Sequence, residues 1–122
     1  MKNIYLAAIL AALALPASAD DTGNKLASDC AKSMIYCVGY VTGVYDGMKF
    51  GSAIVAELAR RKGDARTNAA MENLQEICLP SGVTKGQMAD VVLEYIRSEP
   101  TKRHLDAGYL TFLGLREAFP CR

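Results

Sequence analysis

Apolar residues recur every three or four positions along much of the chain, which is the spacing of one buried helical face. The first such series consists of Leu26, Cys30, Met34, Cys37, Val41, Val44, Tyr45 and Met48. It predicts one long helix that begins near Leu26. Residues 53–61 continue the helical character and end in a basic turn before Gly63, a residue type that commonly stops a helix.

A second helix is predicted over residues 84–98. Thr84 and Gln87 form a capping box, in which the hydroxyl accepts from the Gln87 N–H and the Gln87 side chain reaches back. The apolar positions that follow are Met88, Val91, Val92, Tyr95 and Ile96. Pro100 ends this helix at about Ser98, because a residue before proline avoids the α region.

A third helix is expected to begin near Asp106, an acceptable N-cap residue, and to stop at Phe119 and Pro120. Its buried residues would be Leu110, Leu113 and either Phe112 or Leu115. Residues 63–68 have the composition of a loop, and residues 69–77 are a further helix candidate. The pattern predicts an all-α fold: a compact small domain with a long first helix and a C-terminal helical hairpin packed on it.

The N-terminus has the features of a signal peptide. Lys2 precedes an apolar run from Ile4 to Leu15, and Ala17 and Ala19 supply the small residues that signal peptidase requires. We therefore expect residues 1–19 to be a cleaved signal peptide and residues 20–122 to form a single domain. An uncleaved membrane anchor is the alternative, although the run is shorter than the ~20 residues that span a bilayer.

The four cysteines predict two disulfides, because an exported chain meets an oxidising compartment. They are Cys30, Cys37, Cys78 and Cys121. On one continuous helix, Cys30 and Cys37 would lie ~10.5 Å apart, too far for a disulfide. We therefore favour Cys37–Cys78 with Cys30–Cys121, and place Cys30–Cys78 with Cys37–Cys121 second. A helix break between Cys30 and Cys37 would restore the third pairing. A zinc site is a weaker alternative, because the cysteine spacing does not suit it.

Glycines recur every four residues in the first helix, at Gly39, Gly43, Gly47 and Gly51. Because each costs a helix up to ~1 kcal/mol relative to alanine, the stripe predicts that another backbone approaches this face closely. Close helix packing is favoured here over a ligand site. Asp46, beside the stripe, is expected to pair within the protein, with a partner contact as the alternative.

Composition and spacing argue against catalysis and against nucleic-acid binding. Without Lys2 the exported chain is formally neutral, so it lacks the basic face that nucleic acid or an anionic membrane selects. Ser81 and Lys85 are four residues apart, where a β-lactamase-type pair needs three. His104 has no candidate nucleophile except cysteines expected to be oxidised, so a solvated or capping role is favoured. We expect no enzyme, no cofactor and no metal.

Several spaced motifs resemble those of the Rap/Tai family of type VI secretion immunity proteins. They are Cys37-x-Gly39-Tyr40-Val41-x-Gly43-x-x-Asp46, Cys78-x-Pro80-x-Gly82-Val83-Thr84-x-x-Gln87, Val91-Val92-x-x-Tyr95, Pro100, Arg103-His104 and Ala118-Phe119-Pro120-Cys121. Residues 48–77 have no counterpart among these motifs and are interpreted as a family-variable insert.

The resemblance implies a small periplasmic protein, often a homodimer, that is not an enzyme. It would bind a toxic peptidoglycan amidase and occlude the active site of that amidase. Loops on a rigid scaffold commonly carry recognition, so the predicted partner-binding residues are Asp64, Arg66, Asn68, Lys102, Arg103 and His104. The alternatives are a periplasmic chaperone or stress protein, which would expose an apolar patch, and a cell-wall hydrolase, which would need a free thiol.

Overall fold

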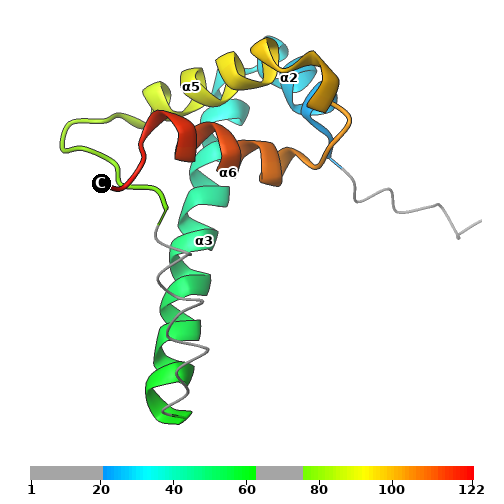
Figure 1. The fold of residues 1–122 in the computed structure, drawn as a ribbon. Helices are drawn as coiled ribbons and strands as arrows, with labels where there is room; N and C mark the ends of the chain where they lie inside the picture. The colour runs from blue at the N-terminus through cyan, green and yellow to red at the C-terminus, as the bar shows by residue number, and fades with distance from the viewer. Residues whose placement is uncertain (1–20, 63–75) are drawn as a thin grey trace, which may run out of the picture.

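The structure is a computed structural model that describes residues 21–62 and 76–122. Its elements in chain order are α2 (Gly23–Lys32), α3 (Met34–Lys62), α5 (Lys85–Ser98), the 3-10 helix η1 (Pro100–Lys102) and α6 (Ala107–Ala118), shown in Figure 1. Within these two ranges β-structure is limited to two isolated bridges. The predicted all-α fold and the predicted bounds of the last two α-helices are therefore confirmed.

The core lies where α2, α5 and α6 gather around the first half of α3. Figure 1 shows α5 and α6 side by side as a hairpin, with the second half of α3 extending well beyond them. The core side chains include Leu26, Val41, Val92, Ile96, Leu110 and Leu115. Gly114 allows the close approach of α5 and α6, because a Cβ on it would lie 3.0 Å from the Cβ of Tyr95.

The predicted long first helix is broken at Ser33. Its backbone is extended, with φ −149° and ψ 106°, and its N–H donates to the Asp29 carbonyl at the end of α2. Its hydroxyl accepts from the Tyr36 N–H at 3.2 Å, so the same residue caps the start of α3. Serine is among the preferred N-cap residues. The break turns Met34, predicted to be buried, into an exposed residue.

The break also corrects the favoured disulfide pairing. The structure contains Cys30–Cys37, with Cα atoms 4.8 Å apart, and Cys78–Cys121, with Cα atoms 4.9 Å apart. These are the pairs that a helix break was expected to restore, and the two pairings placed ahead of them are wrong. The spacing argument failed because it assumed a continuous helix between Cys30 and Cys37. The zinc alternative is also excluded, because all four cysteine thiols are oxidised in disulfides.

The hairpin begins with the local signals that the sequence predicted. Thr84 accepts from the Gln87 N–H at 3.1 Å, which confirms the first half of the capping box. Before it, the Val83 N–H donates to the Pro80 carbonyl in a turn where Gly82 has φ 91°, a conformation that favours glycine. Pro100 follows the end of α5 at Ser98, as predicted.

The segment before this turn lies against the C-terminus. Ile77 forms a bridge with Pro120, and the Cys78 N–H donates to the Phe119 carbonyl at 2.8 Å. Glu76 and Ile77 are therefore not helical, although the predicted helix included them. The rest of that candidate, with the predicted loop over residues 63–68, lies outside the described residues.

The start of α2 is hydrogen-bonded to the chain that leads into α6. The Gly23 N–H donates to the Leu105 carbonyl at 3.0 Å, and the Asn24 N–H donates to the Arg103 carbonyl at 2.9 Å. Asp106 accepts from the Tyr109 N–H at 2.8 Å, which confirms it as the N-cap of α6. Both helix starts are thereby held at one point of the fold.

The glycine stripe does not pack against another element within the described chain. No described atom comes within 4 Å of a Cβ built on Gly39, Gly43, Gly47 or Gly51. Among the described residues, the predicted close backbone approach to this stripe is therefore not found. A close approach occurs instead at Gly23, where an added Cβ would lie 3.1 Å from the Arg103 carbonyl oxygen and would clash with a methyl group of Leu110.

The environments of Gly23 and Gly43 predict opposite effects of an alanine substitution on the free energy of unfolding. Gly23→Ala should lower the free energy of unfolding by ~1–3 kcal/mol, because the Arg103 backbone is fixed by its own hydrogen bond. Gly43→Ala should raise it by up to ~1 kcal/mol, because alanine favours the helix and meets open space. Urea denaturation of both variants measures the two changes. A destabilised Gly43→Ala variant would show that another surface covers the stripe.

Candidate functional site

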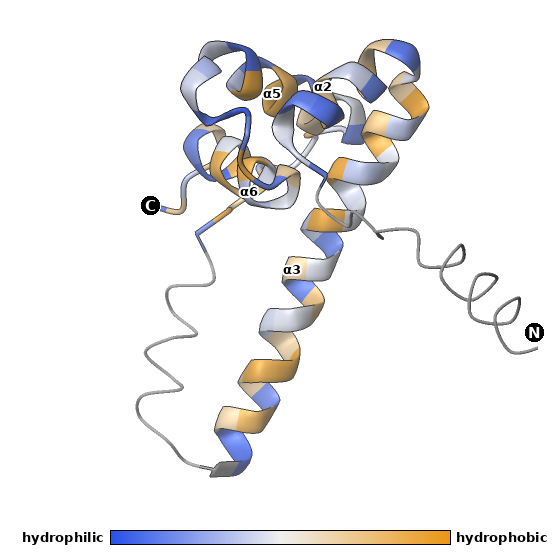
Figure 2. Ribbon diagram, turned by 90° about the vertical axis from the view of Figure 1, so that its right-hand side faces the viewer, coloured by the Kyte–Doolittle hydropathy of each residue, from blue (hydrophilic) through white to orange (hydrophobic). Residues whose placement is uncertain are grey.

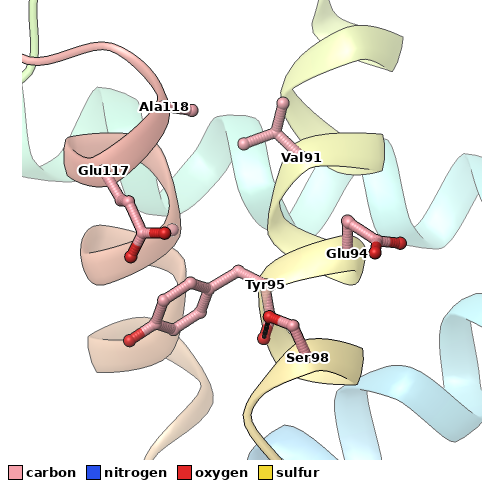
Figure 3. Close-up of a pocket in the computed structure, with 7 residues that line it drawn as sticks. Val91, Glu94, Tyr95, Ser98, Glu117 and Ala118 are labelled. Atoms are coloured by element: carbon pink, nitrogen blue, oxygen red, sulfur yellow. Dashed lines mark hydrogen bonds between the residues drawn. The ribbon is translucent and has the colours of Figure 1, made fainter.

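The described chain has a shallow cleft of about 310 Å³ between α5 and α6. Its lining residues are Val91, Glu94, Tyr95, Ser98, Gly114, Glu117 and Ala118. Figure 3 shows Tyr95 and Glu117 facing each other from the two helices, with Val91 and Ala118 at one end. The cleft is therefore an apolar trough with an aromatic ring and carboxylates along it.

The polar groups of this cleft are already engaged or solvated. The Ser98 hydroxyl donates to the Tyr95 carbonyl at 2.9 Å. The Lys102 ammonium donates to the Tyr95 hydroxyl at 3.4 Å and lies 5.6 Å from the centre of the ring. No lining residue pairs a nucleophile with a base, which acyl or glycosyl transfer would require.

The predicted partner-binding residues fall into two groups. Asp64, Arg66 and Asn68 lie outside the described residues. Lys102, Arg103 and His104 lie together between α5 and α6, as their sequence positions require. Of these three, only His104 is exposed, because the side chains of Lys102 and Arg103 contact α5.

Arg103 holds the end of α5. Its Nε donates to the Ile96 carbonyl at 2.8 Å, and its Nη2 donates to the Arg97 carbonyl at 2.6 Å. These are carbonyls of the last turn of a helix, where a cation is favoured by the helix dipole. Lys102 is held by Glu99 at 3.1 Å, and this contact raises the pKa of Lys102 above its usual value. Both residues therefore have a structural role that the sequence did not reveal.

The start of α2 carries a small charged network. The Lys25 ammonium lies 2.7 Å from Asp29 and 3.2 Å from Asp21, and the hydrogen bond from Lys25 holds the pKa of Asp29 below its usual value. Nearby, burial and then the charges of Asp106 and Asp21 raise the pKa of Tyr40. This network is structural, since it joins neighbouring side chains around the helix start.

Asp46 is exposed and forms no ion pair with any other described residue. Internal pairing was the favoured prediction, and the described ranges contain no partner for it. They also contain no cluster of three His, Cys, Asp or Glu side chains that could hold a metal ion. None of the described helices is long and apolar enough to cross a membrane.

Two groups of exposed apolar side chains were missed by the sequence reasoning. The first is the run Met34, Ile35 and Tyr36 at the start of α3. The second, the arm stripe, consists of Phe50, Ile54 and Leu58 on the part of α3 that extends beyond the core. Figure 2 shows apolar bands along this part of the helix. The four-residue spacing of the arm stripe was the available signal, but it was interpreted only as helix.

Comparison with known proteins gives one match. A family model described as Rap1a immunity proteins matches residues 22–121, which is nearly the whole described chain and the segment between its two ranges. No curated protein and no solved structure matches this chain. The matched region contains both disulfides, the Thr84 and Asp106 helix caps and the hairpin. The chain therefore belongs to the Rap1a immunity protein family.

Proposed function

We propose that the protein is a periplasmic immunity protein that binds a type VI secreted peptidoglycan amidase and occludes its active site. The family match over residues 22–121 carries this proposal, because an immunity protein acts by binding a toxin. Two disulfides support an oxidising compartment. The signal-peptide features of residues 1–19 support the periplasm in particular.

The proposed mechanism is binding without catalysis. The exported chain is formally neutral, so long-range attraction of a toxin should be modest, and affinity should rest on local anchors. Exposed apolar and aromatic side chains are the groups that usually supply such anchors. The described surface offers them at the start of α3 and on the arm stripe.

The arm stripe supports a homodimer as part of this proposal. Phe50, Ile54 and Leu58 remain 69%, 44% and 51% exposed, although large apolar side chains gain from burial. If two copies of α3 pair antiparallel about Ile54, Phe50 of each copy lies opposite Leu58 of the other. The same alignment places Asp46 opposite position 62 of the second copy, where the sequence has Lys62, a residue of opposite charge. A second copy therefore fits the stripe in both apolarity and charge.

A chaperone-like role is the alternative that one observation favours. Such a protein should expose an apolar patch, and the arm stripe is one. The two functions differ in their partners, because a chaperone binds many unfolded chains weakly, whereas an immunity protein binds one folded toxin in a fixed ratio.

The immunity function predicts a stoichiometric complex. We expect a neighbouring gene to encode a peptidoglycan amidase. Residues 20–122 should bind that purified amidase and suppress its cleavage of peptidoglycan, with one immunity chain for each amidase. Isothermal titration and a peptidoglycan digestion assay measure the two effects, and an unrelated amidase is the control. Equal inhibition of both amidases, or binding only to unfolded proteins, would contradict the proposal.

The homodimer predicts that a charge at Ile54 separates the subunits. Sedimentation should show a dimer for the wild type and a monomer for Ile54→Asp, because the substitution places two carboxylates face to face at the centre of the interface. Tyr109→Asp is the matched control, since Tyr109 is similarly exposed but lies on α6. A wild-type monomer, or a dimeric Ile54→Asp variant, would exclude this interface.

A further inference from the structure

The corner between α2 and α3 is a closed loop with an outward-facing tip. Six consecutive residues, 31–36, are all exposed, while the flanking Cys30 and Cys37 are buried. The disulfide joins the two ends with Cα atoms 4.8 Å apart. We call residues 31–36 the knuckle. The flanking cysteines belong to the core, whereas residues 31–36 lie on the surface.

The backbone of the knuckle is fixed before any partner arrives. The Ser33 N–H donates to the Asp29 carbonyl at 2.9 Å, and the Ser33 hydroxyl accepts from the Tyr36 N–H at 3.2 Å. The disulfide restrains both ends in addition. A loop held in its bound conformation loses little entropy on association. The knuckle therefore has the rigidity of a preorganised binding element.

The side chains at the tip of the knuckle are apolar although the fold does not bury them. Met34, Ile35 and Tyr36 are 48%, 88% and 41% exposed, so Ile35 contributes almost no buried area to stability. A run of three exposed apolar residues is unfavourable in a soluble protein unless it serves a function. The ring of Tyr36 lies 6.2 Å from that of Tyr40, which extends the aromatic surface one turn along α3.

The size and shape of the tip select the kind of partner. Three side chains of ~200 Å² each, exposed to these fractions, offer on the order of 350 Å², less than half of the ~800 Å² per partner in a standard interface. Two convex tips would bury still less of each other, so a second copy does not fit. The tip suits a concave apolar site that surrounds Ile35, with the rest of the contact made elsewhere.

The flank of the knuckle leaves room for the walls of such a site. Gly39 follows Ile35 by one turn of α3 and carries no side chain, and no described atom lies within 4 Å of a Cβ built there. A cleft that takes in Ile35 can therefore reach the α3 backbone. The absence of a side chain at Gly39 would then serve the partner contact, whereas packing within the described chain does not require it.

We propose that the knuckle is the anchor of the protein, inserting Ile35 into an apolar cleft on its toxin partner. The inference rests on the proposed function and adds the contact surface to it. The predicted loop residues Lys102 and Arg103, which hold α5, would then be secondary to Ile35 in binding. A central apolar anchor of this kind usually dominates the affinity of an interface.

The test compares the wild type and three variants of residues 20–122 for binding to the amidase partner expected under the proposed function. Ile35→Asp should weaken binding by about 100-fold or more, as expected for a buried hot spot that acquires a charge. Ile35→Val should retain affinity within a few fold, because it keeps the apolar tip. Tyr109→Asp, at an exposed aromatic residue on α6, should bind like the wild type. Thermal unfolding should be unchanged in Ile35→Asp, because the side chain is already solvated.

The outcomes separate the two proposals. If the wild type binds the amidase and Ile35→Asp binds it equally well, the knuckle is not the anchor, whereas the immunity function stands. If the wild type itself does not bind, the proposed function fails and the inference fails with it. A loss of binding shared by Ile35→Asp and Tyr109→Asp would also overturn the knuckle, since the effect would not be specific to it.

Discussion

The arrangement of the molecule depends on the Cys30–Cys37 disulfide across the helix break at Ser33. Without the break, α2 would continue in line with α3 and could not turn toward the hairpin. With it, α2 lies against the core, where Leu26 is buried, and its first N–H groups reach the chain before α6. The disulfide fixes this turn, because its two sulfur atoms lie on either side of the extended residue. Both the placement of α2 on the core and the exposure of the knuckle therefore depend on this disulfide.

A second disulfide restrains the other end of the fold. Cys78–Cys121 joins the segment before α5 to the residues after α6, next to the Ile77–Pro120 bridge. A domain of this size buries only part of the surface that its unfolded chain exposes, so two covalent restraints add substantially to its stability. The second half of α3 receives no such support from the core, and it carries the arm stripe. The chain therefore combines a disulfide-linked core with an exposed apolar surface.

Local signals in the sequence predicted the elements well, whereas their spatial relations were harder to predict. Thr84, Pro100 and Asp106 act on neighbouring backbone groups, so their effects could be read directly and were confirmed. Ser33 was missed because the apolar spacing continues across it, and that error carried over to the disulfides. The hydroxyl of Ser33 was the available signal. Glycine spacing shows that a helix face lacks side chains but not what lies against it, so the sequence could not assign the glycine stripe to a neighbouring element.

The partner-binding residues remain predictions, because a binding surface depends on tertiary contacts that the sequence pattern does not show. Side-chain type suggested Lys102 and Arg103 for recognition, but their contacts with Tyr95, Ile96 and Arg97 give them a structural role. Ile35 was identified from its exposure in the structure. The apolar spacing of the sequence does not predict exposure for a residue beside a helix break. Family membership gives the class of function, and the site of contact is the subject of the proposals above.

Peptide mapping without reduction tests the central cross-link most directly. Trypsin cleaves after Lys25, Lys32 and Lys49, so it separates Cys30 from Cys37. Mass spectrometry should find residues 26–32 linked to residues 33–49, and residues 67–85 linked to residues 117–122. Residues 26–32 linked instead to residues 117–122 would contradict the helix break, the knuckle and the fold built on them.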